Sequence, residues 1–222
     1  MRTVLNLVRL ARPSHWLKNV FLFAALIFAK RVADAGAWAA AWTAFAAFCL
    51  ASSAVYAFND VLDRREDAAH PVKRRRPVAS GDIGAGAALA WSLVLALGAV
   101  GVSLLVRPWF PVLLGAYLVL MVAYTVVLKR VAILDVLVIA SGFVIRAMAG
   151  GEAVGVEVSH WLLLCTLTLS LFLGFAKRES ERVALGDAAA NTRSVQWTVY
   201  TERSLQHMMT VSAGLAIVTY ML

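Results

Sequence analysis

The chain has 222 residues, of which 61% are hydrophobic and 15% charged, and its mean hydropathy is +0.77. Soluble domains contain about 45–50% apolar residues, so this composition excludes an ordinary soluble domain and favours a membrane protein. The net charge is +8, from 21 Lys and Arg against 13 Asp and Glu. Because the basic residues lie between apolar runs, we attribute the excess to membrane topology and anionic ligands, and expect no nucleic-acid partner.

Seven apolar segments follow one another along the chain, with lengths near the roughly 20 residues that a helix needs to cross a bilayer. The shorter alternating segments of a membrane strand barrel are absent from the sequence. The pattern therefore predicts a single all-α domain, a polytopic transmembrane helical bundle, preceded by a short amphipathic surface helix within residues 1–19. The predicted spans are residues 17–30, 37–58, 84–106, 110–128, 131–149, 159–176 and 204–222.

The distribution of Lys and Arg predicts the orientation of these spans. Alternating crossings place the N-terminus, loop 59–82, residues 129–130 and segment 177–203 on one side of the membrane. That side holds 17 of the 21 basic residues. Because basic residues accumulate in cytoplasmic loops, we expect this side to face the cytoplasm.

The end of the second span carries three aspartates, Asp60, Asp63 and Asp67. At about 100° per residue they fall within a ~60° arc of a helix. Carboxylates on one face repel one another unless a cation lies among them, and oxygen ligands suit Mg²⁺, which is usually bound together with phosphate. We therefore expect Asp60, Asp63 and Asp67 to be metal ligands and catalytic residues, with the amide of Asn59 beside them. The alternative is a solvated helix end.

The second half of the same loop is basic. His70-Pro71 breaks the helix, and Lys73 and residues 74–76 follow. Cations beside carboxylates can bind phosphate oxygens, and Arg can do so bidentately. The alternative carries equal weight, because a loop on the cytoplasmic side is basic for reasons of topology alone.

Further polar residues lie at the ends of spans on the same side of the membrane, and we expect them to bind substrate. Asp135 and Arg146 lie within an apolar span, where ionisable groups are costly and usually functional. Arg146 is near the far end of that span, so its side chain can equally snorkel to the interface. The candidates outside loop 59–82 are Lys18, Asn19, Tyr124, Lys129, Asp135, Arg146, Lys177, Arg178 and Glu181.

Other classes of chemistry lack their motifs. The two cysteines, Cys49 and Cys165, lie inside apolar runs, which argues against a disulfide framework or a Cys metal site. His15, His160 and His207 are isolated and favour packing roles. No Gly-x-Ser-x-Gly, P-loop or GxGxxG motif occurs, so the sequence supports neither a serine hydrolase nor a nucleotide-hydrolysing transporter.

The motif NDxxDxxxD at residues 59–67 resembles the first Asp-rich motif of the UbiA-like intramembrane prenyltransferase superfamily. ARPSHWLKN (11–19) and HPVKRRRPVASG (70–81) resemble RPxxWxKN and HPxKxxRPxASG of one branch, the decaprenyl-phosphate phosphoribosyltransferases. FVIRAMAGG (143–151) and AKRESE (176–181) resemble later segments of that branch, and Tyr200-Thr201 resembles the start of its next helix. The matches extend over almost the full chain, and their common order is more specific than any one of them.

The resemblance implies a reaction in which a polyprenyl phosphate attacks C1 of 5-phosphoribosyl 1-diphosphate and pyrophosphate leaves, for cell-envelope (cell wall) synthesis. It implies Mg²⁺ as cofactor, held by the three aspartates. It also implies phosphate contacts from Lys73, Arg76, Lys177 and Arg178, and a role for Glu181. The implied location is the bacterial-type inner (plasma) membrane, with several spans and a cytoplasmic active site.

Two other functions remain open. The first is an aromatic prenyltransferase of quinone synthesis, whose second Asp-rich motif binds a prenyl diphosphate. After Asp82 this chain contains only Asp135 and Asp187 and no DxxxD, which lowers that alternative. The second is a transporter or membrane scaffold, which would spread its polar residues along a pathway.

The number of helices departs from the pattern of the family that the sequence resembles. That family has nine transmembrane helices, and we expect about seven here, with the last two missing.

Overall fold

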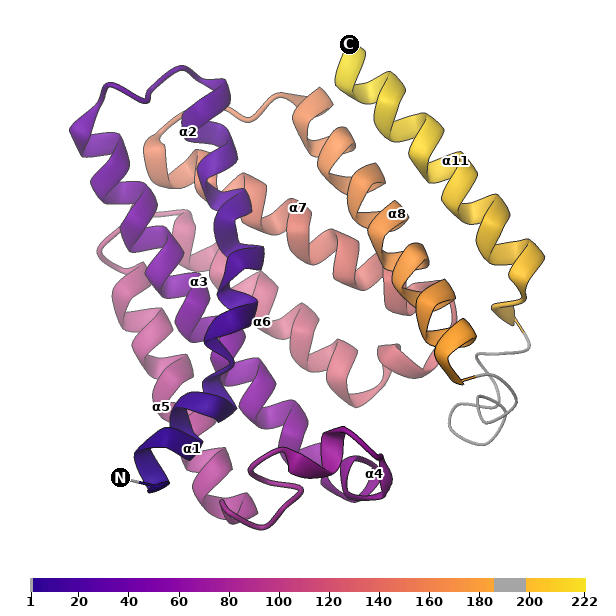
Figure 1. Ribbon diagram of the computed structural model, residues 1–222. Helices are drawn as coiled ribbons and strands as arrows, with labels where there is room; N and C mark the ends of the chain where they lie inside the picture. The colour runs from indigo at the N-terminus through magenta and orange to yellow at the C-terminus, as the bar shows by residue number, and fades with distance from the viewer. Residues whose placement is uncertain (1, 186–198) are drawn as a thin grey trace. The chain divides into compact units, whose positions relative to one another are not determined.

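The computed structural model describes residues 2–185 and 199–222, and these residues form helices and connecting turns (Figure 1). No strand occurs among them, which confirms the prediction of an all-α fold. The elements are α1 (Arg2–Ala11), η1 (Pro13–Phe23), α2 (Ala24–Phe28), α3 (Ala35–Leu62), α4 (Arg64–Ala69), η2 (Lys73–Arg75), α5 (Ala85–Ser103), α6 (Phe110–Val126), η3 (Leu128–Arg130), α7 (Leu134–Val154), α8 (His160–Leu185) and α11 (Glu202–Met221).

Each of the seven predicted spans contains a helix. Four described helices are long and apolar enough to cross a bilayer: α3, α5, α7 and α8. The apolar α6 is shorter, and the sixth span extends further than predicted, since α8 continues to Leu185. These helices make the chain a multi-pass membrane protein.

The N-terminal segment differs in detail from the predicted surface helix. Helix α1 ends at Ala11, because the residue before a proline is disfavoured in the α conformation and Pro13 follows Arg12. Arg12 instead adopts a left-handed backbone conformation with φ 52°. The first span then begins at Pro13 as the 3₁₀ helix η1 and continues into the short α2.

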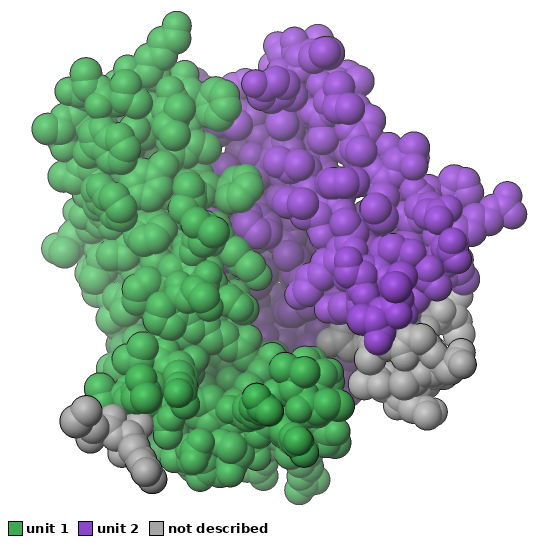
Figure 2. All heavy atoms as spheres, in the orientation of Figure 1, with its two compact units in different colours: residues 1–119, 149–156 green, residues 120–148, 157–222 purple. Residues whose placement is uncertain are grey.

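The described residues form two compact units, coloured separately in Figure 2. Unit 1 comprises residues 1–119 and 149–156, and unit 2 comprises residues 120–148 and 157–222. Helices α6 and α7 therefore each contribute to both units. The expected single domain over residues 1–222 stays a prediction.

Unit 1 is built around α3, which packs against α5, η1 and α1. Its buried face is rich in alanine, a small residue that lets neighbouring helices approach closely. At the end that carries loop 59–82, a small cluster of Leu10, Ala57, Val78, Ile83 and Ala88 joins α1, α3, α5 and the loop. This apolar cluster holds the loop against α1, α3 and α5.

Glycine 150 allows α7 to reach the first span within unit 1. A Cβ at Gly150 would overlap the backbone carbonyl group of Leu22. Only glycine avoids this overlap without backbone movement, because the clashing atoms belong to the main chain. Gly150 of FVIRAMAGG therefore has a packing function.

Unit 2 contains the packed pair α8 and α11, drawn in orange and yellow in Figure 1. Val136, Phe175, Tyr200 and Leu205 form its buried cluster and link the start of α7 to both helices. Helix α11 begins after Thr201, whose hydroxyl accepts a hydrogen bond from the Ser204 backbone N–H at 3.2 Å. This is an N-cap, which satisfies a backbone donor that the first helical turn leaves free.

Candidate active site

The acidic residues of loop 59–82 lie on a nearly continuous helical path. Helix α3 ends at Leu62 and α4 begins at Arg64, so a break falls at Asp63. Across it, the Asp63 N–H still donates to the Asn59 carbonyl at 2.9 Å, and the Asp67 N–H donates to the Asp63 carbonyl at 2.8 Å. Because these i→i−4 bonds persist, Asp60 and Asp67 remain on a common face, two turns apart.

Two arginines neutralise these two aspartates, in a group that we call the Asp60 cluster: Arg12, Asp60, Asp67 and Arg76. Arg76 Nη1 donates to Asp67 Oδ2 at 2.6 Å and to Asp60 Oδ1 at 3.2 Å. Arg12 Nη2 donates to the same Asp60 oxygen. Asp60 and Asp67 are buried, with relative exposures of 2% and 3%. Buried carboxylates require such partners, since an unpaired buried charge is strongly unfavourable.

Arg12 reaches Asp60 because of its unusual backbone and an aromatic neighbour. Its left-handed conformation ends α1, and its guanidinium lies 5.0 Å from the centroid of the Tyr56 ring on α3. Burial lowers the pKa of Arg12, and the Asp60 carboxylate opposes that shift. An arginine nevertheless stays charged at any physiological pH. It is therefore a permanent counter-ion of Asp60.

The donor set of the Asp60 cluster fits a hard divalent cation. Asp60 and Asp67 converge on one point, which Arg76 Nη1 fills. A Mg²⁺ site commonly uses one or two carboxylates and completes its shell with water and substrate phosphate. No set of three or more His, Cys, Asp or Glu side chains within the described part of the chain is arranged to hold a metal by itself. Asp63, the third predicted ligand, is half-buried at the junction of α3 and α4.

The remaining candidates of unit 1 have different surroundings. Asn19 is buried, and its amide donates to Cys49 Sγ and Ser52 Oγ at 3.3 and 3.4 Å, so it joins η1 to α3. Lys18 is exposed on η1, Asn59 is half-buried at the end of α3, and Lys73 is half-buried on η2. The structure thus assigns Asn19 a packing contact and leaves the substrate role of Lys18, Asn59 and Lys73 as a prediction.

Unit 2 contains a second buried group, the Asp135 cluster: Asp135, Arg178, Glu181 and Tyr200. Arg178 Nε lies 2.9 Å from Asp135 Oδ2, an ion pair whose geometry is not that of a hydrogen bond. Arg178 Nη1 donates to Glu181 Oε2 at 2.5 Å. Tyr200 donates its O–H to the other oxygen of Asp135. Asp135 is fully buried and Arg178 is 5% exposed, so both side chains are engaged within the protein.

The Tyr200 hydroxyl also accepts a hydrogen bond from the Ile133 N–H at 2.7 Å. Ile133 has φ 69°, a left-handed conformation that is strained for a β-branched residue. Burial raises the pKa of Tyr200, and the hydrogen bond to Asp135 raises it further. The hydroxyl thus stays protonated as a donor, and it joins the segment before α11 to the start of α7.

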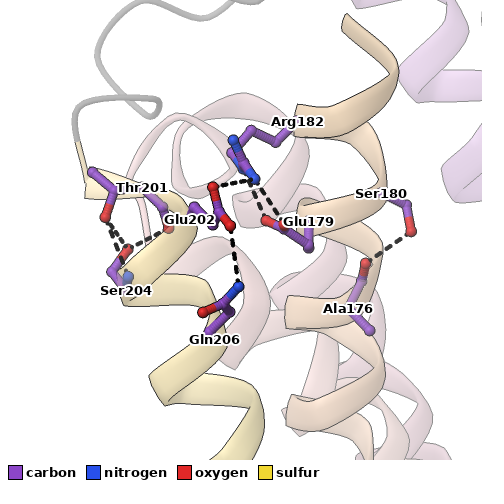
Figure 3. A network of polar contacts seen from close by, with 8 residues as sticks. All are labelled: Ala176, Glu179, Ser180, Arg182, Thr201, Glu202, Ser204 and Gln206. Atoms are coloured by element: carbon purple, nitrogen blue, oxygen red, sulfur yellow. Dashed lines mark hydrogen bonds and ion pairs between the residues drawn. The ribbon is translucent and has the colours of Figure 1, made fainter. Parts of the chain in front are cut away.

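A second polar network joins the C-terminal part of α8 to the start of α11 (Figure 3). Arg182 donates two hydrogen bonds to Glu179 at 2.8 and 2.9 Å and lies 3.6 Å from a Glu202 oxygen. Gln206 donates to Glu202 at 3.3 Å. Glu179 is therefore a structural partner of Arg182. Lys177 is 66% exposed in its side chain and lies 3.9 Å from Glu181.

Arg146 lies on α7 within unit 2 and is 5% exposed. Its Nη1 donates to the Gly142 carbonyl at 2.9 Å, and its guanidinium lies 5.1 Å from the Phe143 ring centroid. Both contacts direct the side chain toward the N-terminal half of α7, the half that carries Asp135. This direction disfavours snorkelling toward the far interface. Tyr124 and Lys129 are half-buried at the end of α6 and on η3.

Two residues that were given no role from the sequence take part in these clusters, Arg12 and Tyr200. Arg12 is 48 residues from Asp60, and Tyr200 is 65 residues from Asp135. Local spacing carries no information about such pairs. The available signal was positional, since both lie in segments that match family motifs, ARPSHWLKN and Tyr200-Thr201.

Comparison with known families supports the interpretation of these motifs. The model of the UbiA prenyltransferase family matches residues 19–222. The chain belongs to this family. The match begins at Asn19 and includes all three aspartates of loop 59–82, so it covers both clusters apart from Arg12.

Two relatives are similar over nearly the whole chain. The decaprenyl-phosphate phosphoribosyltransferase of Mycolicibacterium smegmatis is 34% identical over 224 aligned residues, covering 98% of this chain and 69% of that protein. The enzyme of the same name from Corynebacterium glutamicum is 33% identical, covering 98% of this chain and 66% of that protein. The chain therefore spans about two thirds of the length of these relatives.

A solved UbiA homolog from Archaeoglobus fulgidus, bound to GPP and Mg²⁺, has the same fold. The TM-score is 0.69 at 17% sequence identity, and the match covers 97% of this chain and 85% of that one. At this identity the likeness establishes the fold alone. This UbiA family member thus has a UbiA-like intramembrane fold, as the motifs predicted.

Proposed function

We propose that the protein transfers 5-phosphoribose from 5-phosphoribosyl 1-diphosphate to a decaprenyl-type polyprenyl phosphate. The observation that carries the proposal is the similarity to decaprenyl-phosphate phosphoribosyltransferases over 98% of this chain. Membership of the UbiA family supports an intramembrane transfer to or from a prenyl phosphate. The lipid product serves cell-envelope synthesis, and the site faces the cytoplasm at the plasma membrane.

The residues of loop 59–82 fit this chemistry. A phosphate oxygen of the lipid forms a bond to C1 of the ribose while the bond from C1 to the pyrophosphate oxygen breaks, and pyrophosphate leaves. The lipid phosphate is already an anion, so the reaction requires no strong general base. The residues must instead bind a highly charged leaving group and stabilise the charge that develops on it.

Asp60 and Asp67 are the best-supported cation ligands, because a single positive group already bridges them. Mg²⁺, when bound there, supplies electrostatic stabilisation to the departing pyrophosphate. Asp63 and Asn59 lie next to this position along the chain. Lys73 and Arg76 bind phosphate oxygens from the basic half of the loop, with Lys18 on η1 as a further cation.

The remaining residues that we propose to bind substrate belong to unit 2. Lys177 is the exposed cation of AKRESE and binds phosphate. Arg178 is neutralised by Asp135 and Glu181, so these three residues shape the binding surface around Lys177. Tyr124, Lys129 and Arg146 complete the set of proposed substrate-binding residues.

A paired assay tests the assignment. Purified protein in detergent with Mg²⁺ is given decaprenyl phosphate and radiolabelled phosphoribosyl diphosphate, and the lipid fraction is expected to gain labelled phosphoribose. A parallel reaction contains a prenyl diphosphate and 4-hydroxybenzoate, and no prenylated product is expected. Product in the second reaction alone would replace this assignment by an aromatic prenyltransferase.

A further inference from the structure

In the Asp60 cluster one arginine nitrogen fills the position that a metal would share. Arg76 Nη1 lies 2.6 Å from Asp67 Oδ2 and 3.2 Å from Asp60 Oδ1. A cation bound by both carboxylates would have to lie between the same two oxygens. Arg76 and a divalent cation therefore compete for one place.

The charge balance of the Asp60 cluster also opposes binding of a metal ion without an accompanying anion. Two buried carboxylates face two guanidinium groups, so the cluster is neutral as it stands. A divalent cation added to it would leave two uncompensated positive charges in a partly buried site, which is unfavourable without an anion. The diphosphate of the substrate supplies that anion.

The two arginines differ in their freedom to leave Asp60. The side chain of Arg12 is 16% exposed, lies against the Tyr56 ring and follows a left-handed backbone before Pro13. The side chain of Arg76 is 26% exposed. Its backbone is anchored, because its N–H donates to the Lys73 carbonyl and its carbonyl accepts from the Ser80 N–H. Arg76 can thus move its guanidinium while the loop stays in place.

Arg76 also retains unused donors. Its contacts to both carboxylates come from Nη1 alone. Within the described part of the chain, Nε and Nη2 of Arg76 make no hydrogen bond. A guanidinium presents a planar fork that matches phosphate oxygens bidentately.

We propose that Arg76 is an exchangeable counter-ion of the metal site. It bridges Asp60 and Asp67 in the absence of ligands and transfers to the diphosphate when the metal and diphosphate bind together. This exchange depends on the proposed function in one respect, which is that the substrate must carry a diphosphate group. Because the same residue opposes the metal and favours the anion, metal and diphosphate bind with positive coupling, and this coupling is reciprocal.

Direct binding of Mn²⁺ to the purified full chain in detergent tests the first half of this proposal. Free Mn²⁺ is measured by electron paramagnetic resonance, without any diphosphate. Arg76→Gln is expected to lower the Kd for Mn²⁺ about tenfold or more, because it removes the competing charge from a partly buried site. The matched control is Arg75→Gln, one residue away, because the Arg75 side chain is exposed and its hydrogen bond to Val72 involves only the backbone N–H. It is expected to change the Kd less than about twofold.

Binding of radiolabelled pyrophosphate at saturating Mn²⁺ tests the second half. Arg76→Gln is expected to weaken pyrophosphate binding about tenfold, the opposite direction from its effect on Mn²⁺ alone. Pyrophosphate is used because it tests the exchange without a phosphoribosyl donor. Failure of phosphoribosyl transfer would therefore leave this result intact, and failure of the exchange would leave the transfer assay intact.

Two further variants separate charge from packing. Arg76→Lys keeps the charge and is expected to keep the Kd for Mn²⁺ within about threefold of the wild type. If Arg76→Gln does not fold, Arg76→Met retains the aliphatic stem and takes its place. An unchanged or weakened Mn²⁺ affinity in the neutral variant, equal tightening by Lys and Gln, or unaltered pyrophosphate binding would each overturn the proposal.

Discussion

At the scale of single residues, Asp60 and Asp67 have different surroundings although both belong to one motif. Asp60 Oδ1 accepts hydrogen bonds from Arg12 and Arg76, whereas the Asp67 side chain accepts one from Arg76. Asp60 also lies on the long helix α3, whereas Asp67 lies on the short α4. Loss of charge at the two positions should therefore have different consequences.

Substitution of Asp60 by Asn is expected to reduce stability as well as activity. It leaves Arg12 partly buried without its counter-ion, and removal of one partner of a buried ion pair costs roughly 3–5 kcal/mol. Asp67→Asn leaves Arg76 paired with Asp60, so the protein should keep its thermal midpoint. Its turnover should still fall by about 10²-fold or more, because a proposed metal ligand is lost. Thermal unfolding in detergent and the phosphoribosyl transfer assay measure the two effects.

The control for Asp67→Asn is Glu66→Gln, which removes one negative charge from the adjacent exposed position of α4. It should change neither the thermal midpoint nor turnover appreciably, because exposed charges contribute little. Equal loss of turnover in both variants would show that loop charge in general, and not the position of Asp67, governs the reaction.

At the scale of elements, the Asp135 cluster fastens α11 to the rest of unit 2. Tyr200 precedes α11 and connects the start of α7 to the Arg178 contact on α8. The network of Arg182, Glu179 and Glu202 joins α8 directly to α11 (Figure 3). A buried hydrogen bond such as that from Tyr200 to Asp135 helps to specify one arrangement of the helices.

Removal of one hydroxyl tests this role. Tyr200→Phe leaves the Ile133 N–H without its acceptor and the buried Asp135 without its O–H donor. The loss at Asp135 alone should cost about 1–3 kcal/mol. The thermal midpoint of the purified protein should fall by several degrees. Tyr220→Phe, at a position 75% exposed on α11, is the matched control and should leave the midpoint unchanged.

The pH dependence of this contribution has a definite sign. Burial raises the pKa of Tyr200 above its unfolded value of about 10. The folded state then holds the proton more tightly, so the stabilisation is complete below about pH 10 and declines as pH rises above it. The difference between the wild type and Tyr200→Phe should accordingly be constant through neutral pH.

At the scale of the whole molecule, the charge distribution predicts the orientation. The predicted topology places loop 59–82, which contains Asp60, Asp67 and Arg76, on the side with 17 of the 21 basic residues. Chain segments rich in Lys and Arg remain in the cytoplasm. The water-soluble substrates of the proposed reaction would then be drawn from the cytoplasm and the lipid from the bilayer.

Labelling of single cysteines tests the orientation. In a background with Cys49 and Cys165 replaced by Ala, Arg75→Cys in the loop should react with a membrane-impermeant maleimide only after cell lysis. Val32→Cys, 52% exposed between α2 and α3, should react in intact cells. Labelling of Arg75→Cys in intact cells would reverse the predicted topology.

The sequence by itself determined the class of fold, the places where the helices lie and the family. Hydropathy and helical periodicity are local properties, so seven apolar segments predicted seven helices, and the spacing of Asp60 and Asp67 predicted a common face. The motifs carried the resemblance that the family match confirms. The residues at which helices end were less predictable. Helices α1 and α3 end because Arg12 and Asp63 adopt non-helical backbone conformations.

Only the tertiary structure decided which charges meet. It paired Asp60 with Arg12 and Arg76, and Asp135 with Arg178 and Tyr200. These partners are up to 65 residues apart, and their contact depends on helix packing and rotamers that no local pattern encodes. The physical reason is desolvation: a buried carboxylate must find a partner, and packing determines which one is within reach.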